Sequence, residues 1–399
     1  MPETPLHVLI LDHTGELGGA ERVMLEVLER LPAHGVRATV ACSPAGPLRA
    51  RVEALGVPVW PLGLDEAART LSREAWAAQP WRVAWAARAL LRDALALARR
   101  ARREGVTLLH TNTLKGHLLG TLVGRLTGLP VAWHMHDMPS ARGDTRQLLT
   151  WAAALWRPAC VLAVSRAAAA DLPPALQALA RVVPNGLDLA AFDEAAARRV
   201  APVAWPPGVG PLLGSVSWLI PWKGFDVLLR AMPRIVAVHP DVRLAIVGDA
   251  IFQWRDERAR LEALAVELGI ASRVAFLGAR EDVPALLSCF DVFVHPALQE
   301  PFGRVLLEAM AARRAVVACE AGGVPEVVVP GETALLVPPG EVDALAGAVL
   351  ELLATPARAA RMGEAGRRRV GMAFGLDHQV TQVIGAWSAA LTTPRPRRG

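Results

Sequence analysis

Cysteine is scarce in this chain, and its spacing fits neither a disulfide framework nor a zinc site. The four cysteines lie far apart in apolar segments and include no C-x-x-C pair: Cys42, Cys160, Cys289 and Cys319. Cysteines in such surroundings usually act as small apolar side chains. We therefore expect four buried free thiols and no redox chemistry.

Tyrosine is absent, and all aromatic residues together make up only 5% of the chain. Proteins that bind nucleic acid usually combine basic and aromatic residues in compact motifs, and no such motif is found here. The net charge of +5 and the isoelectric point of 9.6 still indicate attraction to an anionic partner. We expect that partner to be a nucleotide phosphate or a lipid head group, and no nucleic acid.

Long apolar runs are also missing. Charged residues such as Arg157 interrupt each candidate before it reaches the ~20 residues that span a membrane. The start, MPETPLHVLILD, has no basic leader of the kind that precedes a secretory signal. We therefore expect a cytoplasmic protein. Its 399 residues, 53% of them hydrophobic, predict a globular chain of two domains, each of roughly 200 residues.

Lysine is almost absent, because Lys115 and Lys223 are the only two. Lysine carries a compact point charge on a flexible stem, whereas arginine carries a planar fork. Lys223 precedes Gly224 and an amphipathic pattern, so it can bridge phosphate oxygens at the start of a helix. A solvated lysine in a turn is the alternative.

Short apolar segments alternate with helical patterns in both halves of the chain. The expected strands are 6–11, 37–42, 106–112, 130–137 and 159–165 in the first half, and 212–220, 242–249, 273–279, 291–296 and 315–321 in the second. Such alternation is typical of α/β proteins with doubly wound parallel sheets.

Two domains of this kind account for the pattern. We expect an N-terminal domain over residues 1–195 and a C-terminal domain over 196–375, with a weakly patterned linker after Asp188 that ends in APVAWPPGVGP, 201–211. Residues 376–399 are expected to form a helix, a candidate to return to the N-terminal domain, and then a basic tail.

Ligands of open parallel sheets bind beyond the carboxyl ends of the strands, where helix N-termini attract phosphates. Besides the turn at Lys223, two glycine turns have a suitable composition. Gly18 and Gly19 follow the first strand, although a plain tight turn explains them equally well and their spacing is neither a dinucleotide fingerprint nor a Walker loop.

The second glycine turn lies in HPALQEPFGRVLLEAM, residues 295–310. A helix is expected to begin near Pro301, and its first amides can face an anion; they belong to Gly303, Arg304 and Val305. Glu308 lies about one turn further on, where it can accept ribose hydroxyls. Glu300 precedes the turn and can face a sugar hydroxyl.

These residues resemble the retaining glycosyltransferases of the GT-B fold, in particular glycosyltransferase family 4. The hallmark of that family is a Glu-x7-Glu element, matched here by Glu300 and Glu308. Five further segments match in order: GGAERVMLEVL, HMHD, VVPNGLD, PWKG and AGGVPEVVVPGETALLVPPG. The resemblance implies two Rossmann-like doubly wound domains that face each other across a cleft.

The resemblance also implies roles for individual residues. Glu308 would bind the donor ribose, Glu300 would approach the donor sugar, and Lys223 would contact the diphosphate. The Gly18–Gly19 turn would lie near the diphosphate and the acceptor, and His136, next to Asp137, would contact the donor. The nucleobase would be read largely by backbone groups of the loop that contains Leu277 and Gly278.

The implied activity is transfer of a hexosyl group, with retention, from a UDP-, GDP- or ADP-sugar to a glycan, lipid-linked or small-molecule acceptor. No cofactor and no metal is expected. His134 and His136 point to one face of a strand and suggest a metal pair, but no third ligand is evident. Trp218 stands where the family commonly has an arginine that shares the diphosphate charge, and Arg304 is a candidate to replace it.

Two other functions fit the same residues. A sugar-nucleotide epimerase of similar fold would release a 2-epimer without an acceptor, although the Glu-x7-Glu element argues against it. A catalytically silent sugar-nucleotide binding protein is the other alternative, because the usual arginine is missing.

Residues 81–105 form an amphipathic pattern. The apolar positions recur at helical spacing: Val83, Ala87, Leu90, Ala94, Leu97 and Ala101. The arginines lie mainly elsewhere around the helix: Arg88, Arg92, Arg99 and Arg103. Packing of this helix onto the sheet is enough to explain its apolar face. The functional hypothesis is peripheral contact with the anionic inner face of a membrane that carries a lipid-linked acceptor.

Overall fold

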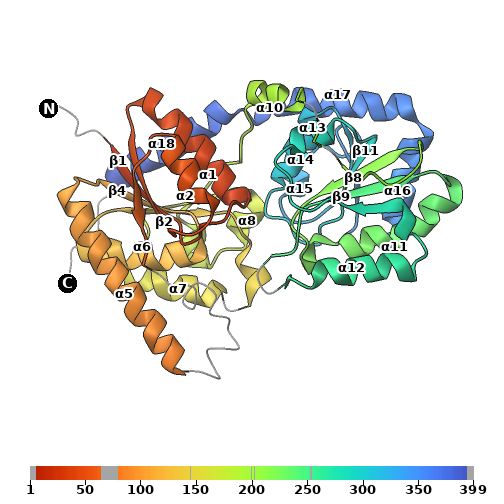
Figure 1. Ribbon diagram of the computed structural model, residues 1–399. Coiled ribbons are helices and arrows are strands. Elements are labelled where there is room, and N and C mark those ends of the chain that lie inside the picture. Colours follow the sequence, from red (N-terminus) through yellow and green to blue (C-terminus); the bar gives the residue numbers. More distant parts are fainter. Residues whose placement is uncertain are drawn as a thin grey trace. The chain divides into compact units, whose positions relative to one another are not determined.

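The computed structural model describes residues 6–63, 80–143, 145–198, 200–201, 203–251 and 254–392. The chain divides into two compact units (Figure 1). Unit 1 comprises Met1–Asn185 and Leu376–Gly399, and unit 2 comprises Gly186–Gly375. Each unit contains one parallel sheet with helices packed against it.

Unit 1 has a seven-stranded sheet of order β3-β2-β1-β4-β5-β6-β7. The strands are β1 (His7–Leu11), β2 (Arg37–Cys42), β3 (Val59–Pro61), β4 (Leu108–Thr111), β5 (Val131–Met135), β6 (Cys160–Ala163) and β7 (Ala180–Val182). The helices are α1 (Gly19–Arg30), η1 (Leu31–His34), α2 (Pro47–Ala54), α5 (Pro80–Arg103), α6 (Leu114–Thr127), η2 (Pro139–Arg142), α7 (Thr145–Leu155), α8 (Arg166–Ala170), α9 (Pro174–Gln177) and α18 (Leu376–Thr392).

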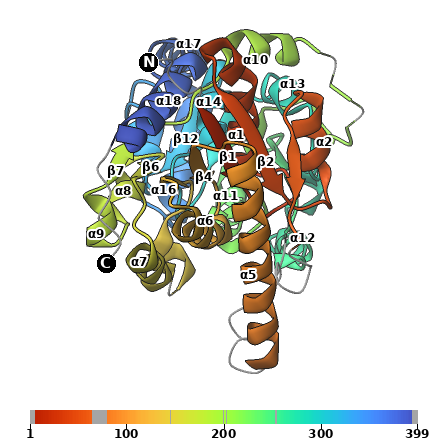
Figure 2. The same ribbon diagram turned by 90° about the vertical axis from the view of Figure 1, so that its left-hand side faces the viewer.

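Both faces of this sheet are buried, which explains why apolar residues occupy successive positions along its central strands. Val8 and Ile10 of β1 pack with α1, α2 and α18. Leu9 and Leu11 point to the other face and pack with α5, α6 and α7. Figure 2 shows these two groups of helices on opposite sides of the sheet.

Unit 2 has a six-stranded sheet of order β10-β9-β8-β11-β12-β13. The strands are β8 (Leu212–Val216), β9 (Arg243–Val247), β10 (Val274–Phe276), β11 (Val292–His295), β12 (Ala315–Cys319) and β13 (Leu335–Val337). The helices are α10 (Leu189–Ala196), η3 (Pro221–Lys223), α11 (Phe225–Val238), α12 (Glu257–Glu267), η5 (Ala271–Arg273), α13 (Val283–Leu287), α14 (Arg304–Ala311), α15 (Val324–Val327), α16 (Val342–Ala354) and α17 (Pro356–Ala373).

The strand order reverses once in each sheet. β1 pairs with both β2 and β4, and β8 pairs with both β9 and β11. Because helices leave in opposite directions on the two sides of such a reversal, an opening forms at the carboxyl ends of the central strands. These two places are where a ligand is expected in each unit.

All ten strands expected from the sequence are present, but several other expectations were wrong. The linker expected after Asp188 contains α10, a helix of unit 2 whose N-terminus Asp188 caps. Cys289 is exposed: it lies beyond the end of α13, whose buried residues are Ala285, Leu286 and Leu287. The other three cysteines are buried. The expected basic tail, 393–399, lies outside the described residues.

The returning helix α18 completes the core of unit 1. Trp387 is fully buried there, and its Nε1 donates a hydrogen bond to Nδ1 of His110 at 3.1 Å. The two rings meet edge to face. α18 therefore contributes to the stability of unit 1, although it follows all of unit 2 in the sequence.

Replacement of this tryptophan is expected to be costly. Trp387→Ala should lower the free energy of unfolding of unit 1 by about 3–5 kcal/mol, as for other buried tryptophans. Urea denaturation followed by far-UV circular dichroism measures the loss. Trp151→Ala is the matched control. The Trp151 side chain is 62% exposed, so its replacement should change the free energy of unfolding by no more than about 0.5 kcal/mol. A similar effect of both replacements would contradict this role of α18.

Candidate functional site

The turn after β8 brings Lys223 to the end of β11. Gly224 ends η3 with a left-handed φ of 68°. A Cβ atom at this position would lie 2.0 Å from the carbonyl oxygen of Pro296, so only glycine fits. The amide of Leu298 donates to the carbonyl of Trp222 at 2.9 Å and joins the same two loops. The glycine therefore fixes the position of the lysine.

Lys223, His295 and Glu300 form a buried cluster at this point. Nζ of Lys223 donates to Oε2 of Glu300 at 2.6 Å, and Nε2 of His295 lies 3.0 Å from the same oxygen. The three side chains are 14%, 2% and 8% exposed. The structure thus places the predicted lysine and glutamate in direct contact with each other.

This cluster holds Glu300 ionised. Burial by itself raises the pKa of the Glu300 carboxyl, but the charge of Lys223 and the hydrogen bond of His295 lower it well below its usual value. An ionised carboxylate only accepts hydrogen bonds, so His295 donates through Nε2. The site therefore contains an ionised Glu300 carboxylate that is already hydrogen-bonded to Lys223 and His295.

The second glutamate lies on α14, which begins at Arg304 and not near Pro301 as expected. Gly303 precedes it with a φ of 91°, and this left-handed residue delays the start of the helix. Nε of Arg304 donates to Oε1 of Glu308 at 3.2 Å, and both side chains are largely covered. The amides of Gly303, Arg304 and Val305 lie at the N-terminus of α14, where unpaired N–H groups attract anions.

The loop predicted to read the nucleobase lies on the same edge of the sheet. Leu277 and Gly278 follow β10, and Gly278 has a left-handed φ of 69°. The amide of Leu277 donates to the carbonyl of Ile246, and the amide of Gly248 donates to the carbonyl of Gly278, both at 2.8 Å. β10 is two strands from β8 in the sheet, so this loop flanks the Lys223 cluster at a distance.

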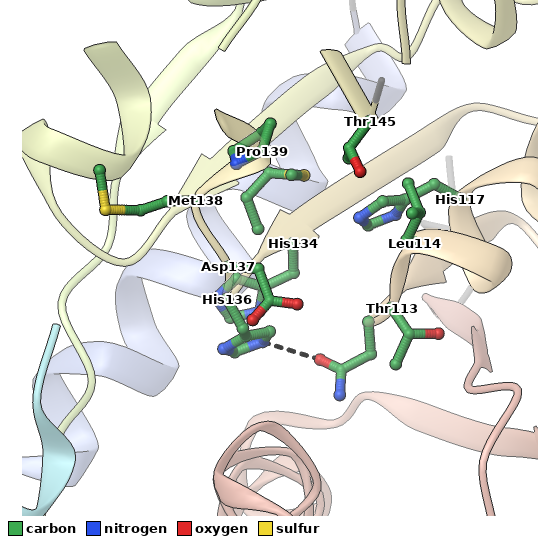
Figure 3. Close-up of a pocket in the computed structure, with 11 residues that line it drawn as sticks. Thr113, Leu114, His117, His134, His136, Asp137, Met138, Pro139 and Thr145 are labelled. Carbon is green, nitrogen blue, oxygen red and sulfur yellow. Dashed lines mark hydrogen bonds between the residues drawn. The ribbon is translucent and has the colours of Figure 1, made fainter. Parts of the chain in front are cut away.

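Unit 1 gathers polar side chains at the carboxyl ends of β1, β4 and β5. Asn112 Nδ2 donates to Oδ2 of Asp12 at 3.0 Å, and Asn112 Oδ1 lies 2.9 Å from Nε2 of His136. His136 and Asn112 also line a small cavity of about 20 Å³ (Figure 3). Such a volume holds about one water molecule. The rings of His134 and His136 lie 4.0 Å apart, as expected for one face of a strand.

The Gly18–Gly19 turn begins α1 at the same end of unit 1. Its conformation is fixed by Glu21, whose Oε2 accepts from the amide of Gly18 at 2.8 Å. Burial, together with the charges of Asp12 and Asp137, raises the pKa of Glu21 to about 8. Gly19 has open space around a hypothetical Cβ, so packing within the chain does not require glycine there.

Four residues of these clusters were not predicted: Asp12, Glu21, Asn112 and His295. Three of them had a signal in the sequence, because they end an apolar strand or follow one directly, as in HVLILD, LLHTN and VFVH. Glu21 had a weaker signal, since it stands three residues after Gly18 in a capping-box position.

Loss of Lys223 is expected to leave an uncompensated charge. Lys223→Met should lower the free energy of unfolding of unit 2 by about 3–5 kcal/mol, because Glu300 stays buried without its cation. The double variant Lys223→Met/Glu300→Gln should be less destabilised, since both charges are gone. Because the pKa of Glu300 is lowered on folding, the contribution of the pair is present at pH 7 and declines in acid.

Urea denaturation of the single and double variants measures both effects. The matched control is Arg198→Met, which breaks a pair with Glu194 whose side chains are 70% and 77% exposed. An exposed pair contributes at most about 1 kcal/mol. A loss of that size at Lys223 would refute a compensating role for it.

The chain matches two family models. Residues 17–191 match Glycosyltransferase Family 4, and residues 206–369 match Glycosyl transferases group 1. An alpha-maltose-1-phosphate synthase of Mycolicibacterium smegmatis is 32% identical over 308 residues, which cover 70% of this chain and 78% of that protein. In fold, the chain resembles HepE of Anabaena in complex with UDP and glucose: TM-score 0.77 and 25% identity over 96% of this chain and 99% of HepE.

A GDP-mannose-dependent alpha-(1-6)-phosphatidylinositol monomannoside mannosyltransferase of M. smegmatis is 38% identical over 197 residues, 47% of this chain. The matched segment spans 49% of the length of that protein and 50% of a related mannosyltransferase of Corynebacterium glutamicum. Two parallel sheets of Rossmann-like topology and two family matches agree. The chain belongs to glycosyltransferase family 4 and has the GT-B fold.

Proposed function

We propose that the protein transfers a hexosyl group from a nucleoside-diphosphate sugar to a glycan, lipid-linked or small-molecule acceptor with retention of configuration. The observation that carries the proposal is the buried Lys223–Glu300–His295 cluster next to the N-terminus of α14. The names of the relatives give the substrate class: GDP-mannose for the mannosyltransferases, and UDP-glucose in a crystal structure of HepE.

Departure of the diphosphate is the step that needs stabilisation. The bond between the anomeric carbon and a phosphate oxygen breaks, and negative charge grows on the diphosphate. Lys223, Arg304 and the first amides of α14 stabilise this charge more as it develops. The acceptor oxygen bonds to the anomeric carbon, and its proton passes to the leaving phosphate on the same face.

The two carboxylates are proposed to recognise hydroxyl groups. Glu308 accepts from the ribose, and Glu300 accepts from the donor sugar once Lys223 turns to the diphosphate. His136 of unit 1 contacts the sugar, and the Gly18–Gly19 turn approaches the diphosphate. Glu21 supports that contact, because its carboxyl is largely protonated at neutral pH and does not repel an anion.

A donor screen tests the proposal. Purified protein is incubated with UDP-, GDP- and ADP-sugars, with and without candidate acceptors, and release of the nucleoside diphosphate is measured. We expect one donor to give acceptor-dependent release. Lys223→Ala, Glu300→Gln and Glu308→Gln should each lower kcat/KM about tenfold to a hundredfold, because each removes a charged hydrogen-bond partner.

The matched control for the carboxylates is Glu267→Gln, at the exposed end of α12, which should leave kcat/KM unchanged. Full transfer by Lys223→Ala would contradict the proposal. Donor binding in calorimetry without turnover on any acceptor would indicate a silent binding protein. Formation of a 2-epimer without an acceptor would indicate an epimerase.

Peripheral membrane contact through α5 is a second part of the proposal. No helix among the described residues is long and apolar enough to cross a membrane. α5 buries Ala94, Leu97 and Ala101 as expected, while the side chains of 80–87, with Val83 and Ala87, lie outside the described residues. Leu91 and Leu95 are exposed and line a groove of about 360 Å³ together with arginines: Arg88, Arg92 and Arg99.

Vesicle sedimentation tests this contact. The protein should bind vesicles that contain phosphatidylglycerol and should leave pure phosphatidylcholine vesicles unbound, because each arginine near an anionic surface contributes about 1 kcal/mol. Replacement of Leu91 and Leu95 by serine should weaken binding severalfold, and high salt should abolish it. Val266→Ser, at an apolar position on α12 that is more exposed than either leucine, is the control and should have no effect. Equal binding to both kinds of vesicle would dismiss the contact.

A further inference from the structure

Asp12 is a buried carboxylate without a basic partner. Its side chain is completely covered, and no lysine or arginine pairs with it in the part of the chain that the structure describes. Glu21, the acidic neighbour that interacts with Asp12, offers no compensating positive charge. An apolar side chain of this size would avoid the cost of burying a charge, so the carboxylate needs another explanation.

The explanation lies in the direction of its hydrogen bonds. Oδ1 of Asp12 accepts from the amide of Thr14 at 3.1 Å, and Oδ2 accepts from Nδ2 of Asn112 at 3.0 Å. A carboxylate accepts but does not donate, so the amide of Asn112 can turn only its oxygen to His136. Nε2 of His136, 2.9 Å from that oxygen, must then carry the hydrogen.

We propose that Asp12 is a positioning residue: through Asn112 it holds His136 as the neutral Nε2–H tautomer and leaves Nδ1 as a hydrogen-bond acceptor for a sugar hydroxyl. The assignment of the hydroxyl rests on the proposed function, whereas the tautomer does not. Nδ1 has no hydrogen-bond partner among the described residues, and His136 lines the cavity of Figure 3.

The surroundings of both residues support this arrangement. Burial, together with His110 and His117, lowers the pKa of His136 to about 3, so the ring is neutral and has a single acceptor nitrogen. Burial raises the pKa of Asp12 to about 6, with hydrogen bonds from Asn112 and Thr14 opposing the shift. At pH 7.5 Asp12 is therefore ionised and can only accept. The tautomer decides whether the free nitrogen of His136 accepts a hydrogen bond or donates one.

The native protein gives the first test. In protein labelled with ¹⁵N-histidine, the ring nitrogens of His136 are assigned by their disappearance in His136→Gln. At pH 7.5 we expect Nε2 to have the chemical shift of a protonated ring nitrogen and Nδ1 to have that of an unprotonated ring nitrogen. The opposite assignment would overturn the proposal, and this test leaves Asp12 and Asn112 as they are in the native protein.

Asp12→Asn gives the second test, because the structure predicts that His136 changes to the opposite tautomer in this variant. The backbone amide of Thr14 keeps the oxygen of the new side chain in place, so the new NH₂ group points at Asn112. Asn112 must turn its oxygen towards that group and its own NH₂ towards His136, and the hydrogen of His136 then moves to Nδ1. The double variant Asp12→Asn/Asn112→Asp should restore Nε2–H, since a carboxylate at position 112 accepts from both neighbours.

Glu21→Gln is the matched control. It makes the same change from acid to amide in the same cluster but does not touch Asn112, so the resonances of His136 should keep the native pattern. A native tautomer in folded Asp12→Asn would refute the positioning role, as would an inverted tautomer in Glu21→Gln.

Catalytic activity gives a third test, which is separate from the tautomer measurements. Asp12→Asn should lower kcat/KM on the order of tenfold to a hundredfold, and the double variant should recover most of it. A protein with the predicted tautomers but no turnover on any nucleotide sugar would refute the proposed function alone. Inverted tautomers with full activity would refute the contact between Nδ1 and substrate.

Discussion

The ion pair between Lys223 and Glu300 is the interaction on which the site of unit 2 depends. It joins two loops that are 77 residues apart in the chain and follow neighbouring strands, β8 and β11. Gly224 allows the approach, because any side chain there would collide with the carbonyl of Pro296. His295 adds a second donor to the same carboxylate oxygen. The pair is buried, so neither member can leave unless another group takes its place. A ligand of this site must therefore exchange partners with it rather than simply add contacts.

Unit 1 balances its buried carboxyl groups by other means. No lysine compensates Asp12 and Glu21 in the described part of unit 1 as Lys223 compensates Glu300 in unit 2. Burial instead raises the pKa values of both carboxyl groups, and Glu21 remains largely protonated at neutral pH. A neutral Glu21 still caps the amide of Gly18. The glycine turn thus keeps its shape, and Glu21 adds no full negative charge beside the diphosphate of the proposed donor.

Much of the fold followed from strand patterns, while the side-chain pairing of the site did not. The three strands that were missed, β3, β7 and β13, are three-residue strands at sheet edges, whereas nine of the ten predicted strands have four to six residues; β10 is the exception. An edge strand needs little apolar surface, so its sequence carries a weak signal. The Glu-x7-Glu element predicted Glu300 and Glu308 as site residues, and these two assignments stay predictions. It could not predict that Lys223 pairs with Glu300, or that Asn112 links Asp12 to His136, since these contacts depend on which strands become neighbours.

The two cation–carboxylate pairs of unit 2 suggest how the proposed donor is selected. Lys223 contacts Glu300, and Arg304 contacts Glu308, so each carboxylate of the Glu-x7-Glu element has a basic partner. A free phosphate can take both cations, but it leaves Glu308 without its arginine and the deeply buried Glu300 with His295 alone. A free sugar can donate to the carboxylates but cannot draw the cations away. A nucleotide sugar carries the diphosphate and the hydroxyl groups in one molecule, so it satisfies all four side chains together. Specificity then follows from the unpaired charges that incomplete ligands leave behind.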